Sequence, residues 1–142
     1  MISVQRITNP TKLEIAFSIR KEVFVEEQHV PLEEEYDEFE ETSIHFLAFI
    51  DNKAVGTARI RTTEKGIKLE RFCVLKNYRK MGVGKSLVNK LLNECNNFPK
   101  SQVYLYAQKI AQNFYSKFGF EAKGEIFLDA GIEHIEMQYK EK

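Results

Sequence analysis

The chain of 142 residues has no tryptophan, three prolines and only two cysteines, Cys73 and Cys95. Two cysteines are too few for a disulfide framework and lack the spacing of a metal centre, so we expect no metal site. The longest uninterrupted apolar run is Phe46 to Ile50, too short to cross a membrane. The N-terminal stretch Met1 to Arg6 has no apolar core typical of a signal peptide. These absences favour a soluble cytoplasmic protein that does not bind membranes.

The chain also has no excess of charge of either sign, because 21 Lys and Arg balance 21 Asp and Glu. A domain that coats nucleic acid needs clustered positive charge, so this balance argues against such a partner. Hydrophobic residues make up 43% of the chain and charged residues 30%, which is typical of a globular protein. The length, with no repeat or flexible linker, predicts a single domain over residues 1–142.

The charges are nevertheless distributed unevenly. No Lys or Arg lies between Lys21 and Lys53, whereas residues 22–52 hold 11 acids. Two interpretations remain open. The segment is either a solvated acidic loop or a wall that attracts a cationic substrate, opposite a basic region that holds an anionic one.

The hydrophobic pattern predicts alternating strands and helices. Asn9 and Pro10 are typical of a helix start, and apolar spacing extends that helix to about Gln28. Two further helices are predicted over 82–94 and around 110–118, and strands over 2–7, 43–51, 54–61, 67–74, 101–107, 120–128 and 132–139. We therefore expect an α/β fold, with flanking helices on a mixed, mostly antiparallel sheet of six to seven strands. The unit over 67–107 should join two parallel strands by a right-handed crossover.

The strand over 67–74 changes phase. Ile67 and Leu69 place apolar side chains on odd positions, whereas Phe72 and Val74 place them on even positions. A regular strand can do this only by burying both faces. The alternative is a β-bulge near Glu70 and Arg71, and the spacing leaves both open.

The loop Arg79-Lys80-Met81-Gly82-Val83-Gly84-Lys85-Ser86 precedes a predicted helix. Glycines there leave backbone N–H groups open to a ligand, and the helix dipole favours an anion such as phosphate. A P-loop requires glycine where Arg79 stands, and a dinucleotide fingerprint requires glycine where Leu87 stands, so neither pattern matches. A plain glycine turn with solvated bases is the alternative.

The pattern Arg-x-x-Gly-x-Gly over 79–84 resembles the acyl-CoA pyrophosphate loop of the GNAT superfamily of N-acetyltransferases. Residues 70–74 lie where that family has a bulged strand, and residues 112–120 resemble its Asn-x-x-Tyr-x-x-x-Gly-Phe helix end. Residues 20–28 and 131–137 are similar to an ElaA-like branch. The resemblance covers nearly the whole chain and is strongest over 67–120.

The resemblance implies a GNAT fold with a splayed central strand pair, and acetyl-CoA as cosubstrate. The acetyl group would pass to an amine by direct attack in a ternary complex. The implied cofactor-binding residues are Phe72, Cys73, Val74, Arg79, Lys80, Met81, Gly82, Val83, Gly84, Lys85 and Asn113. The pantetheine arm would pair with the splayed strand like an added strand, and the loop amides would hold the pyrophosphate.

The catalytic residues implied are Tyr115 as general acid and Glu70 as general base. A phenol is protonated at neutral pH and can donate to the leaving thiolate; the alternative is a core aromatic. His134 and Glu136 are second candidates for the base, because they share one face of the last strand. An acetyl-Cys73 relay is disfavoured, since direct transfer gains its rate from proximity.

The acceptor is predicted to be a small-molecule or protein amine. If the acidic segment walls the acceptor site, as in such folds, it would favour a cationic amine through six side chains: Glu26, Glu27, Glu33, Glu34, Glu35 and Asp37. A non-catalytic acyl-CoA sensor on the same fold is the alternative function. Exposed strand edges leave a homodimer open.

Overall fold

Seven strands form one sheet in the order β1-β2-β3-β4-β5-β7-β6 in the computed structural model, which describes residues 1–140. The last two residues of the predicted domain lie outside this range. The strands are β1 (Ile2–Ile7), β2 (Ile44–Ile50), β3 (Lys53–Thr63), β4 (Gly66–Val74), β5 (Val103–Gln108), β6 (Phe120–Asp129) and β7 (Ile132–Tyr139). All pairs are antiparallel except β4 with β5, so the predicted mixed sheet is confirmed.

Four α-helices connect the strands: α1 (Pro10–Arg20), α2 (Leu32–Glu35), α3 (Val83–Glu94) and α4 (Gln112–Ser116). A π-helix (Lys21–Glu27) continues α1, and short 3₁₀ turns span Lys76–Tyr78, Lys100–Gln102 and Lys109–Ala111. Within residues 1–140, none of the helices has the length and apolar character that a membrane span requires.

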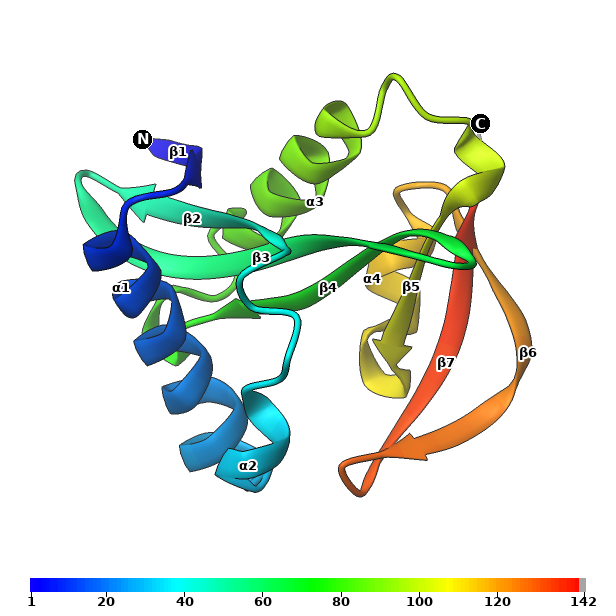
Figure 1. Cartoon of the computed structure of the whole chain (residues 1–142), viewed down its shortest axis with the longest axis horizontal. Coiled ribbons are helices and arrows are strands. Elements are labelled where there is room, and N and C mark those ends of the chain that lie inside the picture. Colours follow the sequence, from blue (N-terminus) through cyan, green and yellow to red (C-terminus); the bar gives the residue numbers. More distant parts are fainter. Residues whose placement is uncertain (141–142) are drawn as a thin grey trace.

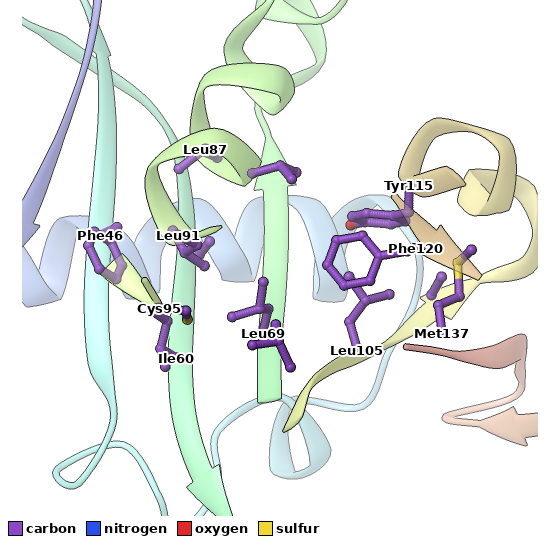
Figure 2. Packing of buried hydrophobic residues seen from close by; sticks show 14 of the residues in the cluster. Phe46, Ile60, Leu69, Leu87, Leu91, Cys95, Leu105, Tyr115, Phe120 and Met137 are labelled. Carbon is purple, nitrogen blue, oxygen red and sulfur yellow. The ribbon is translucent and has the colours of Figure 1, made fainter. Parts of the chain in front are cut away.

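The helices cover both faces of the sheet, with α3 on one face and α1 and α2 on the other (Figure 1). The larger core cluster lies on the α3 side, and Figure 2 labels members from the helices and strands: Phe46, Ile60, Leu69, Leu87, Leu91, Cys95, Leu105, Tyr115, Phe120 and Met137. A smaller cluster lies on the α1 side and comprises Ile7, Ala16, Ile19, Val23, Leu47 and Cys73. Burying a side chain such as Leu contributes about 1.5–3 kcal/mol, so these two clusters hold the layers together.

The first helical segment begins and ends about where it was predicted. The Asn9 side chain accepts hydrogen bonds from the amides of Thr11 and Lys12, which caps α1. The predicted extent to about Gln28 is confirmed, but beyond Arg20 the chain widens from α-helix into the π-helix. The Gln28 amide donates to the Val23 carbonyl, five residues back, as a π-turn requires. The wider turn buries Val23 and brings Glu27 to Arg79.

The phase change in β4 is a bulge. Cys73 pairs with Thr57 and Glu70 pairs with Arg59, so two residues of β4 oppose the single Ala58 of β3. Arg71 within the bulge has a left-handed φ of 58°. The bulge switches the faces, because Ile67 and Leu69 and then Phe72 and Val74 all pack with the α3-side cluster. The predicted bulge is confirmed, and β4 also buries residues on both faces, because Leu69 packs in the larger cluster and Cys73 in the smaller one.

Strands β4 and β5 part beyond the bulge. They pair in parallel only between residues 67–69 and 103–105, after which β5 continues alongside β7. The backbone edge of residues 70–74 that faces β5 therefore has no strand partner. This confirms the predicted splayed pair.

The last predicted helix is shorter than its spacing suggests. The expected stripe of Ile110, Phe114 and Phe118 is wrong at Ile110, which lies in a 3₁₀ turn and is 91% exposed. Only Phe114 and Phe118 pack on the core, through a ring–ring contact of 5.1 Å between centroids. The tighter turn rotates Ile110 away from that face.

Candidate active site

A cavity of about 590 Å³ occupies the splay between β4 and β5. The π-helix and α2 line one side of it, and α4 and the β6–β7 hairpin line another. In Figure 1, α2 and the tip of the β6–β7 hairpin both lie below β4 and β5, with the tip on the β5 side. Within residues 1–140 no group of three His, Cys, Asp or Glu side chains could hold a metal ion.

The turn before α3 exposes backbone donors at one end of this cavity. Lys80 and Gly82 have left-handed φ values of 66° and 92°, and Gly82 caps the helix. The amides of residues 83–85 form the first turn, where a helix has no internal acceptor for them. A Cβ on Gly84 would lie 3.2 Å from the Phe114 ring, so glycine keeps the approach to the cavity open. Open amides on a tight turn fit the phosphates of an acyl-CoA.

Arg79 begins this turn and is already paired. Its Nη1 and Nη2 donate to the two carboxylate oxygens of Glu27 at 2.7 and 2.6 Å, and its Nε donates to the Val74 carbonyl at 2.9 Å. Arg79 therefore connects the turn to the π-helix. Its positive charge is therefore already shared with the Glu27 carboxylate.

The predicted cofactor-binding residues separate into two groups. Five line the cavity: Phe72, Cys73, Val74, Arg79 and Gly84. Lys80, Met81, Gly82 and Lys85 lie exposed on the turn, beside the cavity, and Val83 is buried in the core below it. Asn113 is exposed on α4 and does not line the cavity, although its neighbours Phe114 and Tyr115 do.

Tyr115 is a buried side chain of α4 that lines the cavity. Its ring packs against Phe72 at 5.6 Å and Phe114 at 5.1 Å between centroids. Its hydroxyl forms no hydrogen bond within residues 1–140, and Figure 2 shows that oxygen directed toward β4. Burial raises the pKa of the phenol above its ordinary value, so Tyr115 stays protonated at neutral pH. Tyr115 both packs in the core and lines the cavity, and its role as general acid stays a prediction.

Cys73 lines the cavity from the α1 side but is buried. Burial raises the pKa of its thiol well above the ordinary value. The thiolate is the nucleophilic form, so Cys73 is a poor nucleophile here.

Glu70 lies within a buried ion network rather than alone. Its carboxylate lies 2.7 Å from Arg59, 2.8 Å from Arg61 and 3.1 Å from Lys68. Burial opposes its ionisation, but the hydrogen bond from Arg61 and the nearby cations lower the pKa of Glu70 to about 2. A carboxylate that holds protons so weakly is a poor base for an ammonium group.

The acidic segment folds back onto arginines from elsewhere in the chain. Arg20 donates to the carboxylates of Glu35 and Glu40, and Arg59 donates to Asp37 and Glu40. The hydrogen bond and charge of Arg59 lower the pKa of Asp37 to about 2, against the opposing effect of burial.

Three of the six acids that were expected to attract a cationic amine are already paired. Glu35 and Asp37 belong to this network and Glu27 is paired with Arg79. Glu26 and Glu33 do not line the cavity, so of the six only Glu34 is both unpaired and lining, and the attraction of a cationic amine stays a prediction. The sequence could not show this, because the arginines lie outside residues 22–52.

His134 lines the cavity from β7, opposite Gln108 of β5. Its Nδ1 lies 2.7 Å from the Ile132 carbonyl oxygen. A carbonyl can only accept, so the proton is on Nδ1 and the neutral ring keeps an unprotonated Nε2. Glu136, the other candidate on this strand, pairs with Lys65 at 2.7 Å and does not line the cavity.

Three cationic residues of the cavity wall were not predicted: Arg61, Lys68 and Arg71. Arg59 and Arg61 alternate on β3, and Lys68 and Glu70 alternate on β4. Charges at every second position share one face of a strand, so this spacing was a usable signal. The bulge, however, was needed to aim Arg71 at the same cavity.

Comparison with known proteins agrees with this geometry. The sequence profile described as an acetyltransferase (GNAT) domain matches residues 7–141. YjcF of Bacillus subtilis (strain 168), described as an uncharacterized N-acetyltransferase, is 44% identical over 130 residues, covering 91% of this chain and 93% of YjcF. The crystal structure of Escherichia coli ElaA has a TM-score of 0.88 at 30% identity, covering 99% of this chain and 100% of that one.

An acyl-CoA N-acyltransferase from Pseudomonas aeruginosa has a TM-score of 0.84 at 26% identity, covering 99% of each chain. The profile spans nearly the whole sequence, and the splayed strands and open turn are the features that the resemblance predicted. The chain therefore belongs to the GNAT family of acetyltransferases and is an N-acyltransferase that takes its acyl group from acyl-CoA.

Proposed function

We propose that this protein transfers the acetyl group of acetyl-CoA directly to an amine, in a complex that holds both substrates. One observation carries the proposal. A single cavity extends from the open turn at Gly84, past the free hydroxyl of Tyr115, to the polar wall at Arg61 and Arg71. The reacting groups can therefore meet without passing through solvent.

The splayed strands support the donor side of this proposal. The free backbone edge of residues 70–74 offers N–H and C=O groups to the amides of a pantetheine arm, as an added strand would use them. The open amides of residues 83–85 would hold the pyrophosphate. Bound acetyl-CoA supplies an activated thioester to this cavity.

Tyr115 suits the role of general acid. Its hydroxyl has no partner within residues 1–140, and its raised pKa keeps the proton available. An ordinary thiol has a pKa of about 8.5, so a phenol can stabilise the departing thiolate by donating a hydrogen bond.

His134 suits the role of general base better than Glu70 does. The Ile132 carbonyl directs the proton to Nδ1 and leaves Nε2 as an acceptor at the cavity. Histidine is the side chain whose ordinary charge change lies nearest neutral pH. We assign Glu70 instead to positioning Arg59, Arg61 and Lys68.

The burial of Cys73 supports direct transfer over a cysteine relay, since its raised pKa keeps the thiol protonated. Initial rates of CoA thiol release, measured while both substrates are varied, test this choice. We expect intersecting double-reciprocal lines, which indicate a ternary complex. Parallel lines, with an acetylated Cys73 found by mass spectrometry, would contradict direct transfer. Binding of CoA without turnover on any amine would contradict the proposed enzyme.

The base assignment is tested with His134→Gln. We expect kcat to fall by about 10²-fold near pH 7, in the range of general base catalysis. Glu136→Gln on the same strand is the matched control, because Glu136 does not line the cavity. A kcat in His134→Gln equal to that of the control would remove His134 from this role.

A further inference from the structure

We propose that the amine acceptor also carries a carboxylate, which is bound by the guanidinium group of Arg71 with Arg61 on the wall of the same cavity. The inference rests on the proposed function and names the class of acceptor for that site. Three observations support it: the charge of the ion network, the unused donors of the two arginines, and the strained backbone at Arg71.

The ion network is not electrically balanced. Five cationic side chains take part in it: Arg20, Arg59, Arg61, Lys68 and Arg71. Among the described residues, the four carboxylates paired with them are Glu35, Asp37, Glu40 and Glu70. One positive charge is left over in a half-buried setting, where an anion is attracted more strongly than at an exposed surface.

Two of the arginines are saturated and do not line the cavity. All three nitrogens of Arg20 donate to Glu35 or Glu40, and all three of Arg59 donate to acids of the network. Both side chains are 1% exposed. These two arginines hold the acidic segment against the sheet, which is a structural role.

Arg71 differs from Arg20 and Arg59 in its position at the cavity and in its few hydrogen bonds. It lines the cavity, and its only hydrogen bonds are two contacts of 3.3 Å from Nη2, to the Glu35 carbonyl and to Asp37. Its Nη1 has no partner within residues 1–140, and its buried Nε lacks a hydrogen bond, with Glu35 at 3.4 Å in poor geometry. Nε is shielded from solvent, so Nη1 is the nitrogen that an arriving acceptor can reach.

The backbone conformation at Arg71 also supports the inference. Its φ of 58° lies in the left-handed region, which is unfavourable for a residue with a long side chain. The bulge that imposes this conformation turns the guanidinium toward the cavity. Strain of this kind is found preferentially at functional sites.

Arg61 offers a second set of unused donors. Its Nε donates to Glu70 at 2.8 Å, while neither terminal nitrogen donates to any group within residues 1–140. The guanidinium lies over the Phe39 ring at 4.0 Å from the centroid, which fixes its plane. A planar guanidinium with free N–H groups matches the two oxygens of a carboxylate.

A carboxylate suits this site better than a phosphate. The surplus is a single charge, and the exposed Glu34 and Asp129 also line the cavity. Those two acids would repel a dianion, whereas they are compatible with the amino end of the acceptor. The chemistry therefore points to amino acids, or to molecules with the same pair of groups.

The first experiment compares acceptors that differ in one group, with acetyl-CoA as donor and CoA thiol release as the signal. The pairs are phenylalanine with phenethylamine, lysine with cadaverine, and β-alanine with ethanolamine; O-phosphoethanolamine replaces the carboxylate of β-alanine by phosphate. We expect kcat/KM to be about 10- to 100-fold higher for the carboxylate member, the range for a hydrogen-bonded charge. Equal rates within pairs, faster decarboxylated amines, or preference for O-phosphoethanolamine would each overturn the inference.

The second experiment uses Arg71→Gln and Arg61→Gln, with the exposed Arg6→Gln as matched control. We expect the acceptor KM to rise about 10- to 100-fold in Arg71→Gln and less in Arg61→Gln, only for carboxylate acceptors. The KM for acetyl-CoA should stay unchanged, and Arg71→Lys should recover part of the loss. A variant that fails to fold would lose thermal stabilisation by CoA, in which case Arg71→Lys alone decides. An unchanged acceptor KM in a variant that still binds CoA would overturn the inference.

The two proposals fail in different ways. If CoA does not stabilise the wild-type protein, the proposed function fails. If CoA stabilises it but no carboxylate-bearing amine of the panel is acetylated or adds further stabilisation, the acceptor inference fails while the CoA site stands.

Discussion

The two ends of the cavity handle charge by different means. At the turn before α3, the donors are backbone amides of a turn whose residues Lys80 and Gly82 are left-handed. At the opposite end, the charges are side chains that mostly neutralise each other, and the guanidinium groups of Arg71 and Arg61 keep unused donors at the cavity.

The two ends of the cavity should therefore tolerate different substitutions. The turn depends on backbone conformation, so it should be sensitive to a new Cβ and indifferent to distant charges. The network depends on charge pairing, so it should be sensitive to the loss of one partner. Tyr115 lies between the two ends and should affect chemistry without disturbing either.

The strongest test of this separation is Tyr115→Phe. We expect kcat to fall by about 10²- to 10⁴-fold, because the proton donor is lost, while the Kd for CoA stays within about twofold. Assays of CoA thiol release measure kcat, and isothermal titration measures the Kd for CoA. Tyr139→Phe is the matched control, since Tyr139 packs on Phe120 in the core and does not line the cavity. Turnover equal to wild type would remove Tyr115 from the acid role.

The network end is tested with Glu70→Gln. We expect the free energy of unfolding to fall by about 3–5 kcal/mol, because three cations lose a buried partner. Urea denaturation measures this, with the exposed Glu121→Gln as control. A loss below about 1 kcal/mol would show that Arg59, Arg61 and Lys68 do not depend on Glu70.

Glu70→Gln should also change how the stability of the protein depends on pH in the acidic range. The pKa of Glu70 in the folded protein is about 2, below the value of about 4.3 for an unfolded glutamate. Its ionised form therefore contributes stability above about pH 5, and this contribution is lost as the pH falls toward 2. We expect Glu70→Gln to flatten the acid limb of the stability curve. An identical slope in wild type and variant would contradict the low pKa.

The turn is tested with Gly82→Val, which gives the smallest expected effect. A β-branched residue at φ 92° is strained and would move the amides. We expect the Kd for CoA to rise about tenfold, the equivalent of about 1.4 kcal/mol. Gly124→Val is the matched control, because Gly124 has a φ of 81° and open space but lies outside the cavity. A similar loss of CoA affinity in both variants would indicate a general cost of strain.

Local patterns predicted most of the fold. Alternation and helical spacing located every strand, and the change of phase between Leu69 and Phe72 predicted the bulge. The local patterns did not predict the type of helix that follows Arg20. The helix through Val23 keeps an apolar period, but the chain becomes π-helical where Arg20 is drawn into its ion pairs.

The candidate site was predictable at the turn and unpredictable at the network. The glycines at 82 and 84 act on their own neighbourhood, so a short motif is sufficient to identify them. Glu35 and Asp37 seemed free for a substrate because their partners, Arg20, Arg59 and Arg71, lie up to 36 residues away.

The sequence by itself determined the order of the elements and the glycine turn, because each depends on the conformational preferences of consecutive residues. It also showed the change of phase in β4, but the tertiary structure decided that a bulge causes it. Only the tertiary structure decided which charges are cancelled and which remain for a ligand. Residues far apart in the chain must meet before they can pair or desolvate each other, so the low pKa of Glu70 and the spare donors of Arg71 exist only in the folded protein.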